Sequence, residues 1–168
     1  MRILVFSDSH ADMENMIAVI EEMEDVDFIF HLGDHTDDAE KIENKFPDIP
    51  LFNVRGNNDY DRTPLIQKAH IGGVTFILTH GHKERVYTTL QSLADLADIH
   101  EGDMVLFGHT HATFLTEING VSFLNPGSIS YPRDSRVPTF AIIDVEDGQC
   151  ECHIMEYIDA TTWQERMM

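Results

Sequence analysis

Residues 3–34 read ILVFSDSHADMENMIAVIEEMEDVDFIFHLGD and combine two short apolar runs with a helical pattern between them. The runs Ile3–Phe6 and Phe28–Phe30 have the length and the continuous apolar character of buried strands. Between them, large apolar side chains recur at helical spacing and form one apolar face: Met13, Met16, Ile17, Ile20 and Met23. A strand, a helix and a second strand in this order predict a right-handed βαβ unit with parallel strands.

The rest of the chain extends this unit and then changes character. Asp37–Lys45 is predicted as a second helix, Leu51–Val54 as a third strand and Val86–Ala97 as a later helix. Met104–Phe107 is a further buried strand. Dipeptides that favour tight hairpin turns separate the other strand-like runs: Gly72-Gly73, Asn119-Gly120 and Asp147-Gly148. Strand–helix units followed by hairpins predict an α/β core with mixed sheets.

The length and the composition indicate one ordinary globular domain. A chain of 168 residues can form one sizeable core and is short for two, so we expect a single domain over residues 1–158 and a poorly specified tail over 159–168. Met1 leads directly into a strand-like run, and no apolar stretch has the length of a membrane span. We therefore expect a cytoplasmic protein without a membrane partner, and an oligomer is left open. Cys150 and Cys152 flank one residue, which suits plain strand residues better than a disulfide framework or a zinc knuckle.

The charge is strongly acidic. Thirty Asp+Glu against eleven Lys+Arg give a formal net charge of −19, which repels polyanions, so we expect no long nucleic acid as a partner. Ten histidines accompany these carboxylates. Carboxylates and imidazoles brought together are ligands for divalent transition metals.

Polar clusters directly follow five of the predicted strands. Because ligands bind at the carboxyl ends of the strands in an open α/β sheet, we expect these clusters to meet. Each cluster alone has a simpler explanation, such as a helix cap at Asp8-Ser9 or a turn at Gly33-Asp34. Gly108 is expected to let the backbone turn where its strand ends. The clusters are Ser7–His10, His31–His35, Arg55–Asp59, Thr79–His82 and Gly108–His111.

In chain order the clusters read Asp-x-His, Gly-Asp, Gly-Asn-x-Asp, His and Gly-His-x-His. This order resembles the calcineurin-like metallophosphoesterase superfamily, in register from residue 1 to about residue 133 and including Asn125–Ser128 and Pro132-Arg133. The length and the motif variants are most similar to the small bacterial and archaeal phosphodiesterases of the YfcE-like group. The resemblance implies an αββα sandwich in which two mixed sheets are flanked by helices.

The resemblance also implies a site for two divalent metal ions. One carboxylate is shared by both ions, and each ion has three further ligands. In this sequence the shared residue would be Asp34, the ligands of the first ion Asp8, His10 and His111, and those of the second Asn57, His80 and His109. Such oxygen and nitrogen ligands suit Mn, Fe, Zn, Co or Ni better than Mg or Ca, and manganese is the expected ion.

The implied function is the hydrolysis of small phosphate esters, as a phosphodiesterase or phosphatase, by a hydroxide that both metals activate. Asn58 and His82 are the candidates for contacts with the metal ligands or with the substrate, and Asp59 for orienting a neighbour. Arg55 and Arg133 could meet a phosphate or form structural ion pairs. Asn58 stands where many larger relatives have a histidine that is thought to protonate the leaving group. Activated esters are therefore the expected substrates, unless His10, His82 or water supplies that proton.

Two alternatives to this enzyme remain. The superfamily includes a eukaryotic retromer subunit that serves mainly as an interaction scaffold and has a degraded ligand set, whereas all seven ligand positions are intact here. A metal-dependent nuclease would share the chemistry, but the net charge of −19 and the lack of a basic patch in the sequence disfavour it.

Overall fold

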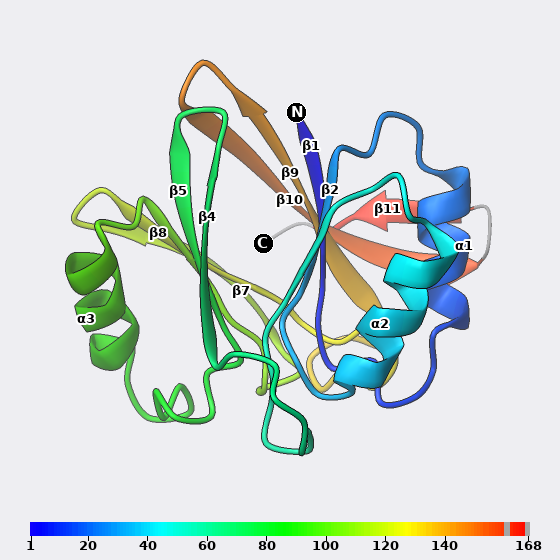
Figure 1. The fold of residues 1–168 in the computed structure, drawn as a ribbon, viewed down its shortest axis with the longest axis horizontal. Coiled ribbons are helices and arrows are strands. Elements are labelled where there is room, and N and C mark those ends of the chain that lie inside the picture. The colour runs from blue at the N-terminus through cyan, green and yellow to red at the C-terminus, as the bar shows by residue number, and fades with distance from the viewer. Residues whose placement is uncertain (160–161, 167–168) are drawn as a thin grey trace.

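The chain folds as an αββα sandwich in the computed structural model of Figure 1, which describes residues 1–159 and 162–166. Its helices are α1 (Glu14–Glu22), α2 (Thr36–Lys45) and α3 (Gln91–His100). Its strands are β1 (Arg2–Phe6), β2 (Phe28–His31), β3 (Leu51–Asn53), β4 (Ile66–Ile71), β5 (Val74–Thr79), β6 (Met104–Leu106), β7 (Thr113–Ile118), β8 (Val121–Pro126), β9 (Thr139–Glu146), β10 (Gln149–Asp159) and β11 (Thr162–Glu165). The predicted fold class is confirmed.

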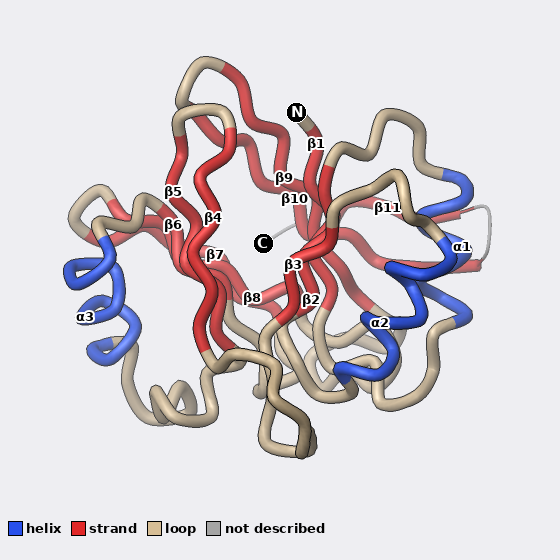
Figure 2. Tube along the Cα trace, viewed as in Figure 1, coloured by secondary structure: helices blue, strands red, loops and turns tan. Residues whose placement is uncertain are grey.

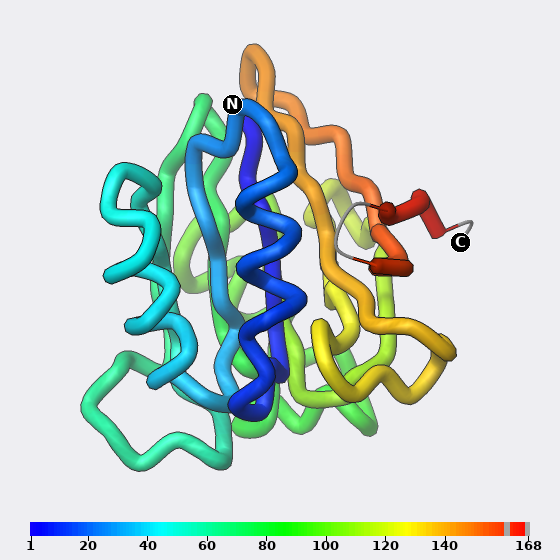
Figure 3. The backbone as a smooth tube through the Cα atoms, turned by 90° about the vertical axis from the view of Figure 1, so that its right-hand side faces the viewer, coloured from blue at the N-terminus to red at the C-terminus, as the bar shows by residue number. Residues whose placement is uncertain are grey.

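One sheet has six strands in the order β11-β10-β9-β1-β2-β3, and the other has five in the order β4-β5-β6-β8-β7 (Figure 2). β1, β2 and β3 are parallel, as the βαβ pattern predicts, and α1 and α2 lie over the outer face of this sheet (Figure 3). The three predicted turn dipeptides join the antiparallel hairpins β4–β5, β7–β8 and β9–β10. α3 lies outside the second sheet.

The core explains why β1 reads as a continuous apolar run. Side chains alternate between the two faces of a strand, and both faces of β1 are covered. Ile3 and Val5 pack between the two sheets, whereas Leu4 and Phe6 pack beneath the helices. All four side chains are fully buried, so an alternating polar pattern is excluded at this position.

The helix predicted over Val86–Ala97 is wrong in its position, because α3 begins at Gln91 and ends at His100. The preceding threonines form local hydrogen bonds that favour turns over helix. The Thr88 hydroxyl donates to the Arg85 carbonyl at 2.9 Å, and the Thr89 hydroxyl accepts from the Gln91 amide at 3.0 Å. The segment from 81 to 90 is consequently a loop at the end of β5.

Part of the predicted tail is ordered as a strand. β11 pairs antiparallel with β10, and the Trp163 ring packs 6.4 Å from the Phe140 ring, which gives this segment an apolar anchor. The domain limit at residue 158 stays a prediction. Cys150 and Cys152 are free thiols on β10, and burial raises the pKa of Cys152 to about 12. Both therefore act as ordinary strand residues.

Candidate metal centre

The loops that carry the predicted polar clusters meet at one end of the sandwich, at the bottom of Figure 1. Four side chains form the centre: Asp8, His10, Asp34 and His111 each offer an oxygen or nitrogen atom, and these atoms lie within 4.8 Å of one another. His111 Nε2 lies 3.2 Å from Asp8 Oδ1 and 3.2 Å from His10 Nε2. The ends of β1, β2 and β6, which are far apart in the sequence, thus contribute to one cluster.

His80 joins this cluster from the end of β5. Its side chain is fully buried, and its Nε2 lies 3.4 Å from Asp34 Oδ1. Its Nδ1 lies 2.7 Å from the Leu32 carbonyl, which can only accept, so Nδ1 carries the proton and Nε2 has the free lone pair. His111 is held in the same way, with Nδ1 donating to the Tyr131 carbonyl at 2.8 Å. Both imidazoles present the tautomer that metal ligation requires.

The donor atoms fit a divalent metal ion. Asp8 Oδ1 and His80 Nε2 are buried and have no hydrogen-bond partner within the described residues. Buried polar atoms without a partner are costly, and lone pairs of oxygen and nitrogen that face one another repel. A cation would satisfy both atoms, and imidazole with carboxylate is a donor set for transition metals.

Hydrogen bonds hold Asp8 by one carboxylate oxygen and leave the other oxygen available to bind a metal ion. Its Oδ2 accepts hydrogen bonds from the Ser7 hydroxyl at 2.6 Å and from the His109 amide at 3.0 Å. Its backbone carbonyl accepts from the hydroxyls of Ser128 and Ser130, at 2.8 and 2.9 Å. Sequence reasoning assigned no role to these serines, although the segment Asn125–Ser128 that contains one of them belongs to the family pattern.

Burial and charge shift the proton affinities of the cluster. Burial raises the pKa of Asp8, but the interactions with His111 and His80 lower it by more. The pKa of Asp8 therefore lies below its usual value. Burial lowers the pKa of His111, and the same contacts with Asp8 raise it overall. For His10 and His109 burial dominates and lowers the pKa, which favours the neutral imidazole.

The two asparagines of the Gly-Asn-x-Asp motif differ in their contacts. Asn57 is exposed, and within the described chain no hydrogen bond joins it to the cluster. Asn58 instead contacts Asp34: its side-chain amide donates to Oδ2 at 2.6 Å, and its backbone amide donates to Oδ1 at 3.0 Å. Ligation by Asn57 stays a prediction.

Asp59 orients backbone rather than a histidine. Its carboxylate accepts hydrogen bonds from four backbone amides, those of Gly56, Asp34, His35 and Thr36, at 2.7 to 3.0 Å. Burial raises the pKa of Asp59, but these donors outweigh burial and lower it. α2 has no side-chain cap at its own N-cap residue, so Asp59 supplies the missing acceptor from another loop.

Aromatic rings surround the cluster. The His82 ring lies 5.4 Å from the His80 ring, and burial lowers its pKa. The Tyr87 ring lies 5.1 Å from the His109 ring, and its hydroxyl donates to the His109 carbonyl and accepts from Arg133. The Tyr131 ring lies 6.0 Å from the His10 ring. Neither tyrosine was identified from the sequence, because a single aromatic residue in a loop is no signal.

Gly108 serves close packing at the point where the chain turns, with the Thr110 amide donating to the Gly108 carbonyl at 2.8 Å. It has no left-handed φ, and a Cβ at this position would lie 1.9 Å from Ser7 Oγ and 2.8 Å from Asp8 Oδ2. Gly56 is similar, because its Cβ would lie 2.1 Å from Asp34 Oδ1. Two glycines therefore leave the space that the two buried carboxylates occupy.

Gly108→Ala is expected to destabilise the protein by about 2 kcal/mol, since overpacking of a filled interior typically costs 1–3 kcal/mol. Gly120→Ala is the matched control. Its Cβ meets nothing within 4 Å, so only the left-handed φ of +81° opposes it, at roughly 1 kcal/mol. Urea denaturation measures both changes, and a Gly108→Ala protein at least as stable as the control would contradict the packing argument.

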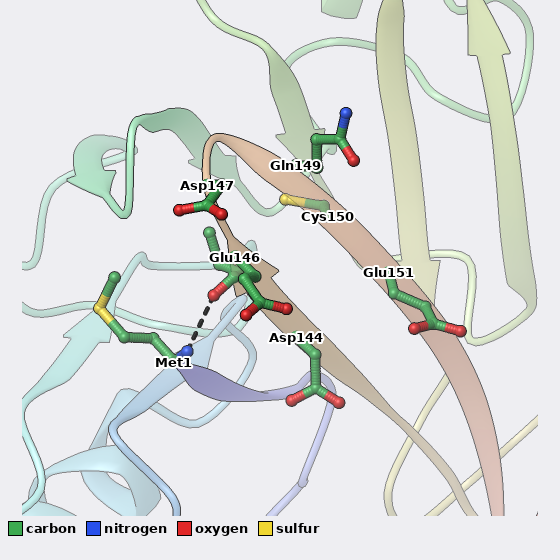
Figure 4. Close-up of a pocket in the computed structure, with 8 residues that line it drawn as sticks. Met1, Asp144, Glu146, Asp147, Gln149, Cys150 and Glu151 are labelled. Carbon is green, nitrogen blue, oxygen red and sulfur yellow. Dashed lines mark hydrogen bonds between the residues drawn. The ribbon is translucent and has the colours of Figure 1, made fainter.

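A separate cavity of about 550 Å³ lies at the opposite end of β1 (Figure 4). Its lining includes the carboxylates of Asp144, Glu146, Asp147 and Glu151. Nearby, the ammonium group of Met1 donates to the Val145 carbonyl at 2.8 Å. An acidic cavity repels anions, so it does not compete with the cluster as a site for phosphate esters.

Comparison with known proteins identifies the family. The calcineurin-like phosphoesterase superfamily domain matches residues 1–148. A probable metallophosphoesterase of Mycoplasma pneumoniae is 31% identical over 153 residues, which cover 88% of this chain and 92% of that protein. The phosphodiesterase MJ0936 of Methanocaldococcus jannaschii is 28% identical over 175 residues, which cover 93% of this chain and 100% of that protein.

A solved structure of vacuolar protein sorting 29 from Cryptosporidium parvum superposes with a TM-score of 0.83 at 18% identity and covers 99% of this chain and 96% of that one. At this identity the similarity shows that the two proteins share a fold, and no more. Within the described residues, no helix is long and apolar enough to cross a membrane. The match over residues 1–148 and the identity to a curated relative agree with the cluster of carboxylates and imidazoles at the strand ends. The chain belongs to the calcineurin-like phosphoesterase superfamily.

Proposed function

We propose that this protein is a metal-dependent phosphoesterase that hydrolyses small organic phosphate esters, with phosphodiesters among its substrates. The observation that carries the proposal is a pair of buried atoms that have no hydrogen-bond partner among the described residues, Asp8 Oδ1 and His80 Nε2, within a cluster of carboxylates and imidazoles. A relative that covers nearly the whole chain is named a phosphodiesterase, which supports the inclusion of phosphodiesters among the substrates.

The site would hold two divalent ions, with manganese proposed as the ion used. Asp8, His10 and His111 would bind one ion and Asn57, His80 and His109 the other, with Asp34 shared. When bound, such ions polarise a phosphoryl oxygen and lower the pKa of water.

The chain's own residues orient this chemistry. Asn58 donates to Asp34 Oδ2, so we assign it to positioning the shared carboxylate. Asp59 fixes the backbone on which Asp34 stands. The Arg133 guanidinium, which donates to the Tyr87 hydroxyl, is available to neutralise a substrate phosphoryl oxygen. The His82 ring, which lies beside the His80 ring, is available to donate a hydrogen bond to one.

The test is metal analysis of the purified protein followed by hydrolysis assays with phosphomonoesters and diesters under Mn, Fe, Zn, Co and Ni. The proposal expects bound divalent metal and hydrolysis that a chelator abolishes and added metal restores. Metal-loaded protein that hydrolyses no ester in the panel would contradict it and would favour the scaffold alternative, for which the fold similarity to vacuolar protein sorting 29 is the supporting observation. A gel-shift and nuclease assay tests the nuclease alternative, which the net charge of −19 disfavours.

Activated esters are expected to be hydrolysed at least about 100-fold faster than alkyl esters, because the amide side chain of Asn58 cannot protonate the leaving group. A positioned general acid typically accelerates such a reaction 10²–10⁴-fold. Bis(4-nitrophenyl) phosphate and dimethyl phosphate provide the comparison under the same metal. Equal kcat/KM values for the two would show that another group protonates the leaving oxygen.

We further propose that residues 1–158 act as one domain in the cytoplasm on small-molecule substrates. Size-exclusion chromatography with light scattering would give the oligomeric state.

A further inference from the structure

More than half of the basic residues of this acidic chain lie in loops at the end of the sandwich that carries the metal centre. Three loops follow β3, β5 and β8, over residues 54–65, 80–90 and 127–138, and they comprise 35 of the 168 residues. They contain six of the eleven Lys+Arg: Arg55, Arg62, Lys83, Arg85, Arg133 and Arg136. Within the described residues, none of these six forms an ion pair with a carboxylate, whereas Arg2, Lys41, Lys45 and Arg166 do. In a chain with thirty acidic residues, six such cations in neighbouring loops indicate a surface that can bind an anionic ligand.

Two of these cations line a defined cavity. It has a volume of about 220 Å³, and its lining consists of Arg55, Gly56, Asn57, Asp59, Leu65, His82 and Lys83. At about 30 Å³ per water molecule, this volume accommodates a phosphoryl group with part of its hydration shell. The single carboxylate in the lining, Asp59, is already engaged by four backbone amides, so it does not cancel both cations.

The cavity adjoins the metal centre through His82. The His82 ring lies 5.4 Å from the His80 ring and 6.2 Å from the His109 ring, and it also lines the cavity. Its Nδ1 is buried and has no hydrogen-bond partner within the described part of the chain. Asn57, an expected ligand, belongs to the same lining. A group in the cavity would therefore be separated from the histidines of the metal centre by the His82 ring.

We propose that this cavity binds a second phosphate group of the substrate, and that the substrate is an organic molecule with a phosphate monoester close to the scissile phosphoester. The inference rests on the proposed function only in that it assumes cleavage of the phosphoester at the metal centre. Binding of the second phosphate in the cavity needs no catalysis. Lys83 supplies a mobile charge, since it is exposed and the described chain offers it no ion pair. Arg55 supplies a fixed one, because its guanidinium donates to the Asp61 carbonyl at 3.0 Å.

A matched pair of substrates tests this proposal: thymidine 5′-(4-nitrophenyl phosphate) with and without a 3′-phosphate. The wild-type protein is expected to show about a tenfold higher kcat/KM for the 3′-phosphorylated ester at low salt, and the advantage should shrink as ionic strength rises. Lys83→Gln and Arg55→Gln should each reduce this ratio several-fold. Lys68→Gln removes the same charge on β4, outside the cavity lining and with its ammonium donating to the His100 carbonyl, and should leave the ratio unchanged.

A binding measurement separates this inference from the proposed function. Thymidine 3′,5′-bisphosphate is titrated calorimetrically into metal-free protein, and the wild type should bind it at least fivefold more tightly than Lys83→Gln. If that difference holds while neither ester is hydrolysed, the phosphate site stands and the proposed function fails. If both esters are hydrolysed equally well and the bisphosphate binds wild type and Lys83→Gln alike, the phosphate site is overturned and the proposed function stands.

Discussion

Asp34→Asn is expected to lower phosphoesterase activity by at least about 100-fold and to reduce the bound metal. Asp34 is almost fully buried, and its carboxylate faces His80 at 3.4 Å and His10 at 3.8 Å. Loss of a partner outside the ligands alone typically costs 10–100-fold in metal affinity or activity, so loss of the shared ligand should cost more. The amide also removes the negative charge that offsets two divalent cations.

Elemental analysis after dialysis against the metal, together with kcat/KM for bis(4-nitrophenyl) phosphate, measures both effects. Asp48→Asn is the control, because Asp48 is an exposed carboxylate without a hydrogen bond or ion pair in the described structure. Circular dichroism of the metal-free proteins separates misfolding from loss of metal. A folded Asp34→Asn protein with full activity and full metal content would refute the assignment of two ions that share this residue.

Local sequence patterns were sufficient for the elements and for much of the fold class. The apolar runs and the turn dipeptides depend on neighbouring residues, so β1 and the hairpins were correctly expected. The division into two sheets was not readable from the residues, because it depends on distant pairings such as β1 with β9 and β6 with β8. The start of α3 was misplaced because two threonine hydroxyls stabilise a turn that apolar spacing does not reveal.

The residues of the candidate site likewise differ in how far the sequence predicted their positions. Asp8, Asp34, His80 and His111 follow strands, and the topology brings strand ends together, so position in the sequence predicted their convergence. The contacts of the loop residues depend on how separate loops pack. Asn58 rather than Asn57 reaches Asp34, and Asp59 binds backbone amides of another loop. The concentration of basic residues in three loops at one end of the sandwich is likewise a property of the fold, since these residues are dispersed along the chain.

Asp59→Asn is expected to destabilise the protein by about 3 kcal/mol. Each oxygen of Asp59 accepts two backbone amides: Oδ1 from His35 and Thr36, and Oδ2 from Gly56 and Asp34. In asparagine one oxygen becomes an NH₂ group, which would face two N–H donors that then have no acceptor. Hydrogen bonds to charged groups contribute roughly 1.5–3 kcal/mol each, and partial exposure keeps the total toward the lower end. The lost negative charge at the start of α2 adds to the effect.

Urea denaturation and thermal melting measure this change, which corresponds to a fall in Tm of roughly 6–12 °C at 2–4 °C per kcal/mol for a chain of this size. Asp61→Asn is the matched control, because Asp61 lies in the same loop and accepts from only one backbone amide among the described residues, that of Thr63, besides the Thr36 hydroxyl. Its loss should remain within about 1.5 kcal/mol. Activity assayed below both melting temperatures should still fall in Asp59→Asn, because the backbone amide of Asp34 is no longer held. If both variants unfold at the same urea concentration as the wild type, the four hydrogen bonds do not stabilise this end of the sandwich, and another contact must hold Asp34 in place.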